Sequence, residues 1–216
     1  MTTDPFTLEI IGDMLRAAAE DMFITMGRTS QSPIIYEVLD CACGITAPDG
    51  DLVAEAEGVP GFIGCLGYGV RAVLRKFGAD NLQPGDIFIT NDPYEGGGTH
   101  LSDVTLIAPV FFDGQLVAFA ANKAHWTEVG GMAAGSWSTG TTEVYQEGLR
   151  FPTIHIYRQG QPMTGLIELI QANVRLPSMT LGDLHAGVAS LRAGQRGITE
   201  VCRRYGVRAL QEAMHT

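Results

Sequence analysis

The stretch Val104-Thr-Leu-Ile-Ala-Pro-Val-Phe-Phe112-Asp-Gly114-Gln-Leu-Val-Ala-Phe-Ala-Ala-Asn-Lys-Ala124 decides the fold. Two runs rich in apolar, β-branched and aromatic residues flank Asp113-Gly114, a dipeptide typical of the tight turn of an antiparallel hairpin. The sequence therefore predicts a hairpin made of strands 104–112 and 115–124. In that register, residues near position 103 lie opposite residues near position 125.

Further strands are expected on both sides of this hairpin. Leu39 to Thr46, a turn at 48–51 and a return strand from Leu52 to Ala56 predict a second hairpin. Short apolar runs at 87–90 and 153–158 predict two more strands. All of the expected strands lie in the middle of the chain.

Helices are expected towards both ends. Asp4-Pro5 is typical of an N-cap and first helical position, and apolar residues follow at helical spacing to about Gly27. A glycine- and proline-rich segment, 58–67, precedes a helix that ends at Gly78, and two C-terminal helices are expected at 164–174 and 180–205, the latter from a capping box at Thr180. Central antiparallel hairpins or a mixed sheet, flanked by terminal helices, predict an α+β fold in one domain, residues 1–216.

Composition excludes several classes of protein. The formal net charge of −10 argues against nucleic-acid binding, which needs a basic face. No run of about 18 apolar residues predicts a membrane span, and the start of the chain resembles no export signal, so a cytoplasmic protein is expected. Four cysteines without a C-x-x-C pair argue against a zinc ribbon and favour reduced thiols: Cys41, Cys43, Cys65 and Cys202.

His100-Leu-Ser-Asp103 is the sharpest chemical feature of the sequence. Imidazole and carboxylate are ligands that suit zinc, iron or manganese. The expected hairpin brings His125 next to His100 and Asp103, so these three side chains are candidate ligands of one divalent ion. The alternative is that both histidines are surface or core-edge groups bonded to the backbone.

Other candidate residues lie around this group. Asp40 interrupts an apolar run, and a carboxylate there is costly unless it is solvated, paired or metal-bound. Asn91-Asp-Pro-Tyr94 is either a simple turn or support that orients His100. The long loop 126–150 carries the candidate catalytic side chains Glu128, Tyr145 and Glu147. The alternative is that Glu128 is a solvated loop residue and that 142–148 is a polar turn.

Several motifs together resemble one known family. They are Asn91-Asp-Pro-Tyr-x-Gly-Gly, Thr99-His-Leu-x-Asp103-Val, Asn122-x-Ala-His125, Gly130-Gly-Met132, Thr142-Glu-x-Tyr-Gln-Glu-Gly-Leu-Arg150, Gln171-Ala-Asn-Val-Arg175 and Gly182-Asp-Leu184. In this combination and order, the chain resembles the hydantoinase B/oxoprolinase family, and specifically the N-terminal part of its longer B-type subunit.

The resemblance implies a catalytic role that depends on a partner. Subunits of this family act with an ATP-binding hydantoinase A-type subunit, and together they open hydantoins, 5-oxoproline or other lactams, whereas related members carboxylate ketones such as acetone or acetophenone. The family's divalent metal, zinc or manganese, is held by residues that match Asp40, His100, Asp103 and His125. The expected function is therefore the metal-dependent subunit of an ATP-dependent cyclic-amide hydrolase.

The sequence also departs from the family pattern and leaves alternatives open. Two histidines of a family His-x-Pro-x-His-x-Gly segment are absent from Gly58-Val-Pro-Gly-Phe-Ile-Gly64, which argues for a substrate other than hydantoin if that segment contacts substrate. The alternatives are the B-type subunit of a ketone carboxylase, a mononuclear iron oxygenase with a two-histidine, one-carboxylate site, and a truncated, non-catalytic assembly subunit.

Overall fold

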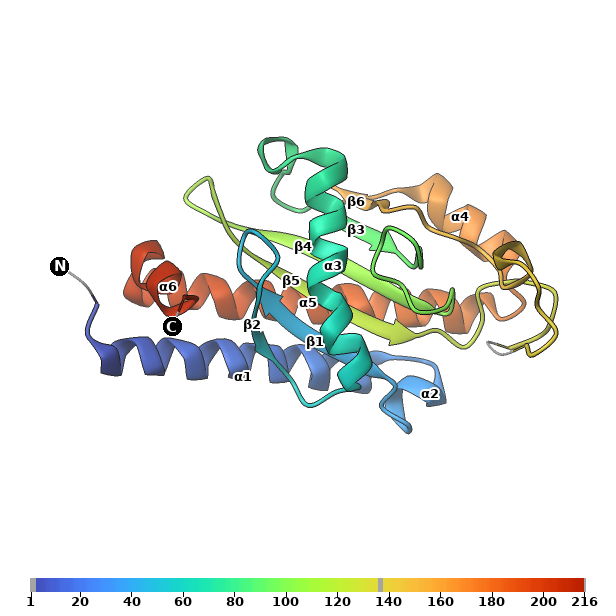
Figure 1. The fold of residues 1–216 in the computed structure, drawn as a ribbon, viewed down its shortest axis with the longest axis horizontal. Helices are drawn as coiled ribbons and strands as arrows, with labels where there is room; N and C mark the ends of the chain where they lie inside the picture. Colours follow the sequence, from blue (N-terminus) through green and yellow to red (C-terminus); the bar gives the residue numbers. More distant parts are fainter. Residues whose placement is uncertain (1–2, 136–137, 216) are drawn as a thin grey trace.

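A computed structural model describes residues 3–135 and 138–215, and its centre is one seven-stranded sheet in the order β2-β1-β5-β4-β3-β6-β7 (Figure 1). Every pair of neighbouring strands in this sheet is antiparallel. The strands are β1 (Cys41–Thr46), β2 (Leu52–Glu55), β3 (Ile87–Thr90), β4 (Asp103–Phe112), β5 (Gln115–His125), β6 (Ile154–Arg158) and β7 (Gln161–Pro162).

Helices cover both faces of the sheet. Helix α3 crosses the front of the sheet in Figure 1, whereas the long helix α5 runs behind it and packs beside α1. The helices are α1 (Pro5–Thr29), α2 (Pro33–Tyr36), α3 (Pro60–Phe77), α4 (Thr164–Asn173), α5 (Pro177–Tyr205) and α6 (Val207–Ala213), with short 3-10 turns at Ala79–Asn81 and Val144–Gln146. Strands in the middle and helices on both sides confirm the expected α+β fold.

The hairpin that opened the sequence analysis forms the centre of the sheet. Its tight turn is built from Asp113 at φ 48° and Gly114 at φ 78°, the left-handed conformations that this kind of turn requires. The register places Asp103 directly opposite His125, which confirms the predicted pairing. The loop 126–150 follows at the same end of the sheet.

Alternation along the central strands separates two environments. Leu106 and Asn122 face α5, where the Asn122 Nδ2 donates to the Gly187 carbonyl oxygen at 2.8 Å and a Cβ on Gly187 would meet Leu106. Because side chains alternate sides along a strand, the neighbouring Thr105 and Lys123 face α3. His125 lies two residues after Lys123 and therefore shares the α3 face.

Two helix starts and two short helices differ from the sequence prediction. Helix α3 begins at Pro60, inside the segment expected to be a glycine-rich connector, because proline is well suited to a first helical turn. Gly67 lets the helix approach other backbone, because a Cβ there would lie 2.5 Å from the Gly50 carbonyl oxygen. Helix α5 begins at Pro177, so Thr180 is not a cap, and α2 and α6 were not predicted.

Two features of the whole chain follow from the fold. All four cysteines are free thiols, and burial raises the pKa of Cys41 to about 12. None of the helices within the described residues combines the length and the apolar character that a bilayer-spanning helix needs.

Candidate metal centre

Two imidazoles converge on one buried carboxylate at the end of the central hairpin. The Asp103 Oδ1 lies 3.2 Å from the His100 Nε2 and 3.0 Å from the His125 Nδ1. Asp103 begins β4 and His125 ends β5, while His100 lies in the turn that leads into β4. The sheet register and that turn therefore bring the three ligand atoms within 4.8 Å of one another.

Burial and hydrogen bonding oppose each other at Asp103. The side chain of Asp103 is 2% exposed, and burial by itself would raise its pKa. Hydrogen bonds from His100, His125 and the Thr99 hydroxyl outweigh burial and hold the pKa of Asp103 well below its usual range. The hydrogen bond to Asp103 raises the pKa of His100 against its partial burial. The site therefore carries a carboxylate that attracts cations.

Asp40 lies next to this group rather than within it. Its Oδ2 is 3.9 Å from the His125 Nδ1, and its carbonyl oxygen accepts the His125 N–H at 3.0 Å. The sequence predicted Asp40 within a strand that begins at Leu39, whereas in the structure β1 begins at Cys41 and Asp40 immediately precedes it. Partial burial raises the pKa of Asp40, while nearby His125 lowers it. Both polar contacts of the His125 ring are on its Nδ1 side; its buried Nε2 has no hydrogen-bond partner among the described residues.

The side chain of Asn91 holds the loop that carries His100 through hydrogen bonds. Its Nδ2 donates to the carbonyl oxygens of Leu101 at 2.6 Å and Leu149 at 2.8 Å, and its Oδ1 accepts the Phe151 N–H. One buried amide directly after β3 thus joins the turn before β4 to the segment at residues 149–151. This is the supporting role that the motif Asn91-Asp-Pro-Tyr94 suggested as one of its two interpretations.

Lys123 fixes the same loop from the sheet, and the sequence reasoning did not single it out. Its side chain is fully buried, and its Nζ donates to the Gly97 carbonyl oxygen at 3.1 Å and lies 5.6 Å from the centre of the Phe62 ring. Burial lowers the pKa of Lys123. A lysine two residues before His125 in an apolar strand was the available signal, because residues i and i+2 share one face.

A cavity of about 250 Å³ opens beside His100. Glu147 lines this cavity from the opposite loop, and its charge contributes to the raised pKa of His100. The other lining residues are Thr99, Ala133, Gly135, Ser138, Thr141 and Gln146. The group of His100, Asp103 and His125 is hereafter the metal-type cluster. Of the three candidate catalytic side chains, Glu147 is the one that the structure brings close to this cluster.

The other two candidate catalytic residues lie in different surroundings. Glu128 is 1% exposed and accepts hydrogen bonds from the Gly130 N–H, from the Arg175 N–H and from the Arg175 Nη1, the last at 2.8 Å. These contacts anchor loop 126–150 to the start of α5, where the Thr180 hydroxyl donates to the Glu128 carbonyl oxygen. Tyr145 is 75% exposed and does not line the cavity. Catalytic roles for Glu128 and Tyr145 stay predictions.

The family model described as hydantoinase B/oxoprolinase matches residues 4–216, nearly the whole chain. The chain belongs to the hydantoinase B/oxoprolinase family. This confirms the resemblance that the motifs indicated.

Individual relatives of this family member are considerably longer. It is 38% identical to an uncharacterised protein of Methanocaldococcus jannaschii over 97% of this chain and 38% of that protein. The crystal structure of the ATP-dependent caprolactamase of Pseudomonas jessenii superimposes with a TM-score of 0.92 at 30% identity, over 100% of this chain and 37% of that chain. Acetone carboxylase, in its nucleotide-free structure, gives a TM-score of 0.90 at 21% identity, over 97% and 28%, and shows the shared fold. The family member thus spans between 28% and 38% of the length of these relatives.

The cluster fits the divalent ion that the family resemblance implies. A tetrahedral zinc with bonds of about 2.0–2.1 Å separates its ligand atoms by roughly 3.3 Å. The two nitrogen–oxygen distances around Asp103, 3.0 and 3.2 Å, are close to that separation. The Thr99 hydroxyl donates to the second carboxylate oxygen of Asp103, the kind of outer contact that orients metal ligands.

The segment that departs from the family motif, residues 58–64, includes the two residues before α3 and the first turn of that helix. Phe62 packs against Lys123, on the side of the metal-type cluster. Pro60, Ile63 and Gly64 line a separate groove against α1 and β2. None of the residues 58–64 lines the cavity beside His100.

Proposed function

We propose that this chain is the B-type component of an ATP-dependent cyclic-amide hydrolase, and that His100, Asp103 and His125 hold a divalent zinc or manganese ion with Asp40 beside them. ATP is used by a separate A-type subunit. The observation that carries the proposal is the convergence of two imidazole nitrogens on one carboxylate oxygen at the wall of a cavity.

In this proposal the ligands hold the ion, and the cavity beside His100 holds the substrate. When bound, a divalent ion at these ligands would polarise a carbonyl oxygen or lower the pKa of a water molecule. Asp103 supplies the negative charge for the ion, and the Thr99 hydroxyl holds the orientation of its carboxylate. Lys123 and Asn91 hold the loop that presents His100. These fixed contacts keep the ligand geometry before substrate arrives.

Glu147 is the group best placed to move a proton. It lines the cavity together with His100, and its carboxylate acts on that imidazole electrostatically. A carboxylate across a small cavity from an electrophilic centre can accept a proton from the attacking water. We assign the general-base role to Glu147, whereas Tyr145, which is exposed on the same loop and does not line the cavity, receives no role in the reaction.

A cyclic amide is favoured over a ketone as the substrate. The caprolactamase is 30% identical over the whole of this chain, whereas the likeness to acetone carboxylase, at 21% identity, concerns the fold alone. A B-type subunit of a ketone carboxylase is the second candidate function. The iron oxygenase of the sequence analysis is disfavoured because an antiparallel sheet covered by helices is not the all-β barrel expected for that class.

Reconstitution with the A-type partner tests the proposal. The chain is co-expressed with a hydantoinase A-type protein from the same genome. ATP hydrolysis and product formation are then measured with lactams, hydantoins and ketones, after metal analysis of the purified complex. We expect about one divalent zinc or manganese per B-type chain and lactam-stimulated ATP hydrolysis.

The variants His125→Ala and Glu147→Gln separate the assigned roles. We expect His125→Ala to lose metal and activity together, and Glu147→Gln to keep the metal and lose turnover. Carboxylation of a ketone would favour the second candidate function, and full activity of His125→Ala would favour the non-catalytic assembly subunit. Stoichiometric redox-active iron in the purified protein would favour the iron oxygenase instead.

A further inference from the structure

The two edges of the sheet are protected to different degrees. At one edge, β7 has two residues and ends in Pro162, which has no N–H to offer to another strand. At the other edge lies β2, which pairs with β1 on one side only. The Ala56 N–H donates to the Cys43 carbonyl oxygen, so the backbone groups of Glu55, the last residue of β2, point away from the sheet. This edge can accept another strand.

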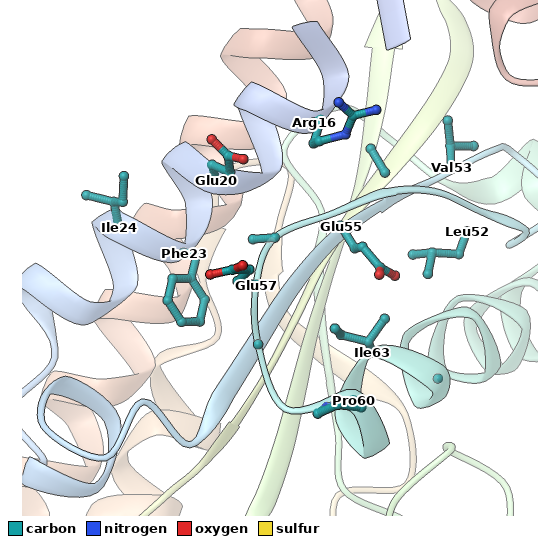
Figure 2. Close-up of a pocket in the computed structure, with 14 residues that line it drawn as sticks. Arg16, Glu20, Phe23, Ile24, Leu52, Val53, Glu55, Glu57, Pro60 and Ile63 are labelled. Atoms are coloured by element: carbon teal, nitrogen blue, oxygen red, sulfur yellow. The ribbon is translucent and has the colours of Figure 1, made fainter. Parts of the chain in front are cut away.

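A groove of about 1060 Å³ runs along the open edge, because α1 and α3 both extend past it on opposite faces of the sheet (Figure 2). Apolar side chains line both walls: Phe23 and Ile24 from α1, and Ile63 from α3. Ile24 is 47% exposed, and Leu52 of β2 is 40% exposed. A strand added to β2 would enter between two helices and cover this apolar surface.

The groove is acidic. Figure 2 shows Glu20 on α1, and Glu55 and Glu57 from the β2 region, around the open edge. Within residues 3–135 and 138–215, no ion pair engages these three carboxylates. The one basic residue that lines the groove, Arg16, is bonded to Asp13 at 2.9 Å. An incoming segment would therefore meet three uncompensated negative charges.

We propose that the groove beside β2 is a docking site for an extended segment of a second protein, in which lysine or arginine accompanies aliphatic residues. The segment adds an eighth strand to the sheet and places its basic side chains near Glu20, Glu55 and Glu57. The four residues of β2 offer an edge of roughly 13 Å, which fits about four residues of partner strand. A second copy of this chain is disfavoured, since β2 paired with another β2 would bring glutamates together.

Binding of designed peptides to the whole chain tests the proposal. The probes are a capped six-residue peptide in which lysine alternates with valine, and the matched peptide in which glutamate replaces each lysine. We expect saturable binding of the fluorescently labelled lysine peptide, measured by anisotropy, that weakens as salt rises, and at least tenfold weaker binding of the glutamate peptide. Equal affinity for the two peptides would overturn the proposal.

Variants locate the binding and separate its two components. The double variant Glu55→Lys with Glu57→Lys reverses the preference between the peptides, whereas Glu168→Lys on α4, an exposed charge far along the chain, changes nothing. Glu20→Lys on α1 weakens the lysine peptide without touching the strand. Glu55→Pro, which removes an outward N–H, weakens binding at least tenfold more than Glu55→Gln, which removes the same charge. Unchanged affinity in the double variant and in Glu20→Lys overturns the proposal, as does a dimer in light scattering that Glu55→Pro dissociates.

Discussion

Asp103 and Asp183 are both almost completely buried, yet their surroundings are opposite. Asp103 is bonded by side chains: two imidazoles and a hydroxyl. Asp183, on α5, accepts the backbone N–H groups of Gln31 and Ser32 on its Oδ1, and its Oδ2 has no partner among the described residues. The pKa of Asp103 lies below its usual range, whereas burial raises the pKa of Asp183 to about 6.

We interpret this difference as one between a proposed metal ligand, Asp103, and a structural link, or clamp, between two segments, Asp183. Backbone donors hold Asp183 as the fixed link between the chain after α1 and the start of α5, and they do not fully offset the cost of burying its charge. Two of the donors around Asp103 are the imidazoles that we propose as metal ligands, so one ion could replace their protons and bind all three groups. For buried acidic residues in one core, the chemical type of the hydrogen-bond donors therefore distinguishes their roles, whereas the extent of burial does not.

Neutralising Asp103 is expected to have the largest effect. Asp103→Asn removes the charge on which both imidazoles converge, and we expect divalent metal to bind at least 100-fold more weakly and activity with the A-type partner to be lost. Metal content of the purified protein and competition with a coloured chelator measure this. The matched variant Asp183→Asn removes an equally buried charge and should keep the metal. Full occupancy in Asp103→Asn would rule out the assigned site.

Asp183 should instead control how stability depends on pH. Its carboxyl ionises near pH 3.8 in an unfolded chain and near 6 in the folded protein, so its stabilising contribution is complete below about pH 4 and is lost as the pH rises through 6. The two-unit difference corresponds to a loss on the order of 3 kcal/mol in the free energy of unfolding. Urea denaturation of metal-free protein from pH 4 to 8 should show this slope, and Asp183→Asn should flatten it. Parallel curves for the two proteins would contradict the clamp interpretation.

Glu128 extends the comparison to a third buried acid. Its carboxylate is bonded by Gly130 and by both the backbone and the guanidinium of Arg175. We expect Glu128→Gln to lower the free energy of unfolding by about 2 kcal/mol, because the amide cannot satisfy all of these donors, and to leave metal affinity unchanged. Chemical denaturation and metal titration measure the two quantities. Loss of turnover with wild-type stability and metal affinity would instead give Glu128 a part in proton transfer.

Local patterns predicted what depends on local structure. The Asp113-Gly114 turn sets the hairpin register, and that register was enough to place Asp103 opposite His125 before any coordinates. The start of α3 at Pro60 was missed because propensity disfavours glycine in helix interiors, whereas Gly67 is required here by its close packing on Gly50.

Contacts between distant segments were not predictable in the same way. Nothing near Glu128 in the sequence points to Arg175, 47 residues later, and nothing near Asp183 points to the backbone at Gln31. The role of Glu147 likewise depends on how loop 126–150 folds back over His100. Such contacts depend on how whole helices, strands and loops pack together. The periodic spacing of apolar residues along the sequence does not predict that packing.

Lys123 gives the smallest but most specific test of how the ligand loop is held. Lys123→Met keeps the length of the side chain and removes the ammonium that bonds the Gly97 carbonyl oxygen, three residues before His100. We expect metal to bind about tenfold more weakly, the size of effect typical when a contact that orients a ligand is lost, with faster hydrogen exchange at residues 96–100. Lys76→Met is the matched control, because Lys76 also donates to backbone carbonyls, those of Pro152 and Thr153, but away from the cluster. If both variants bind metal like the wild type, the three ligands are held by the sheet register alone, and Asp103 differs from Asp183 only in its immediate donors.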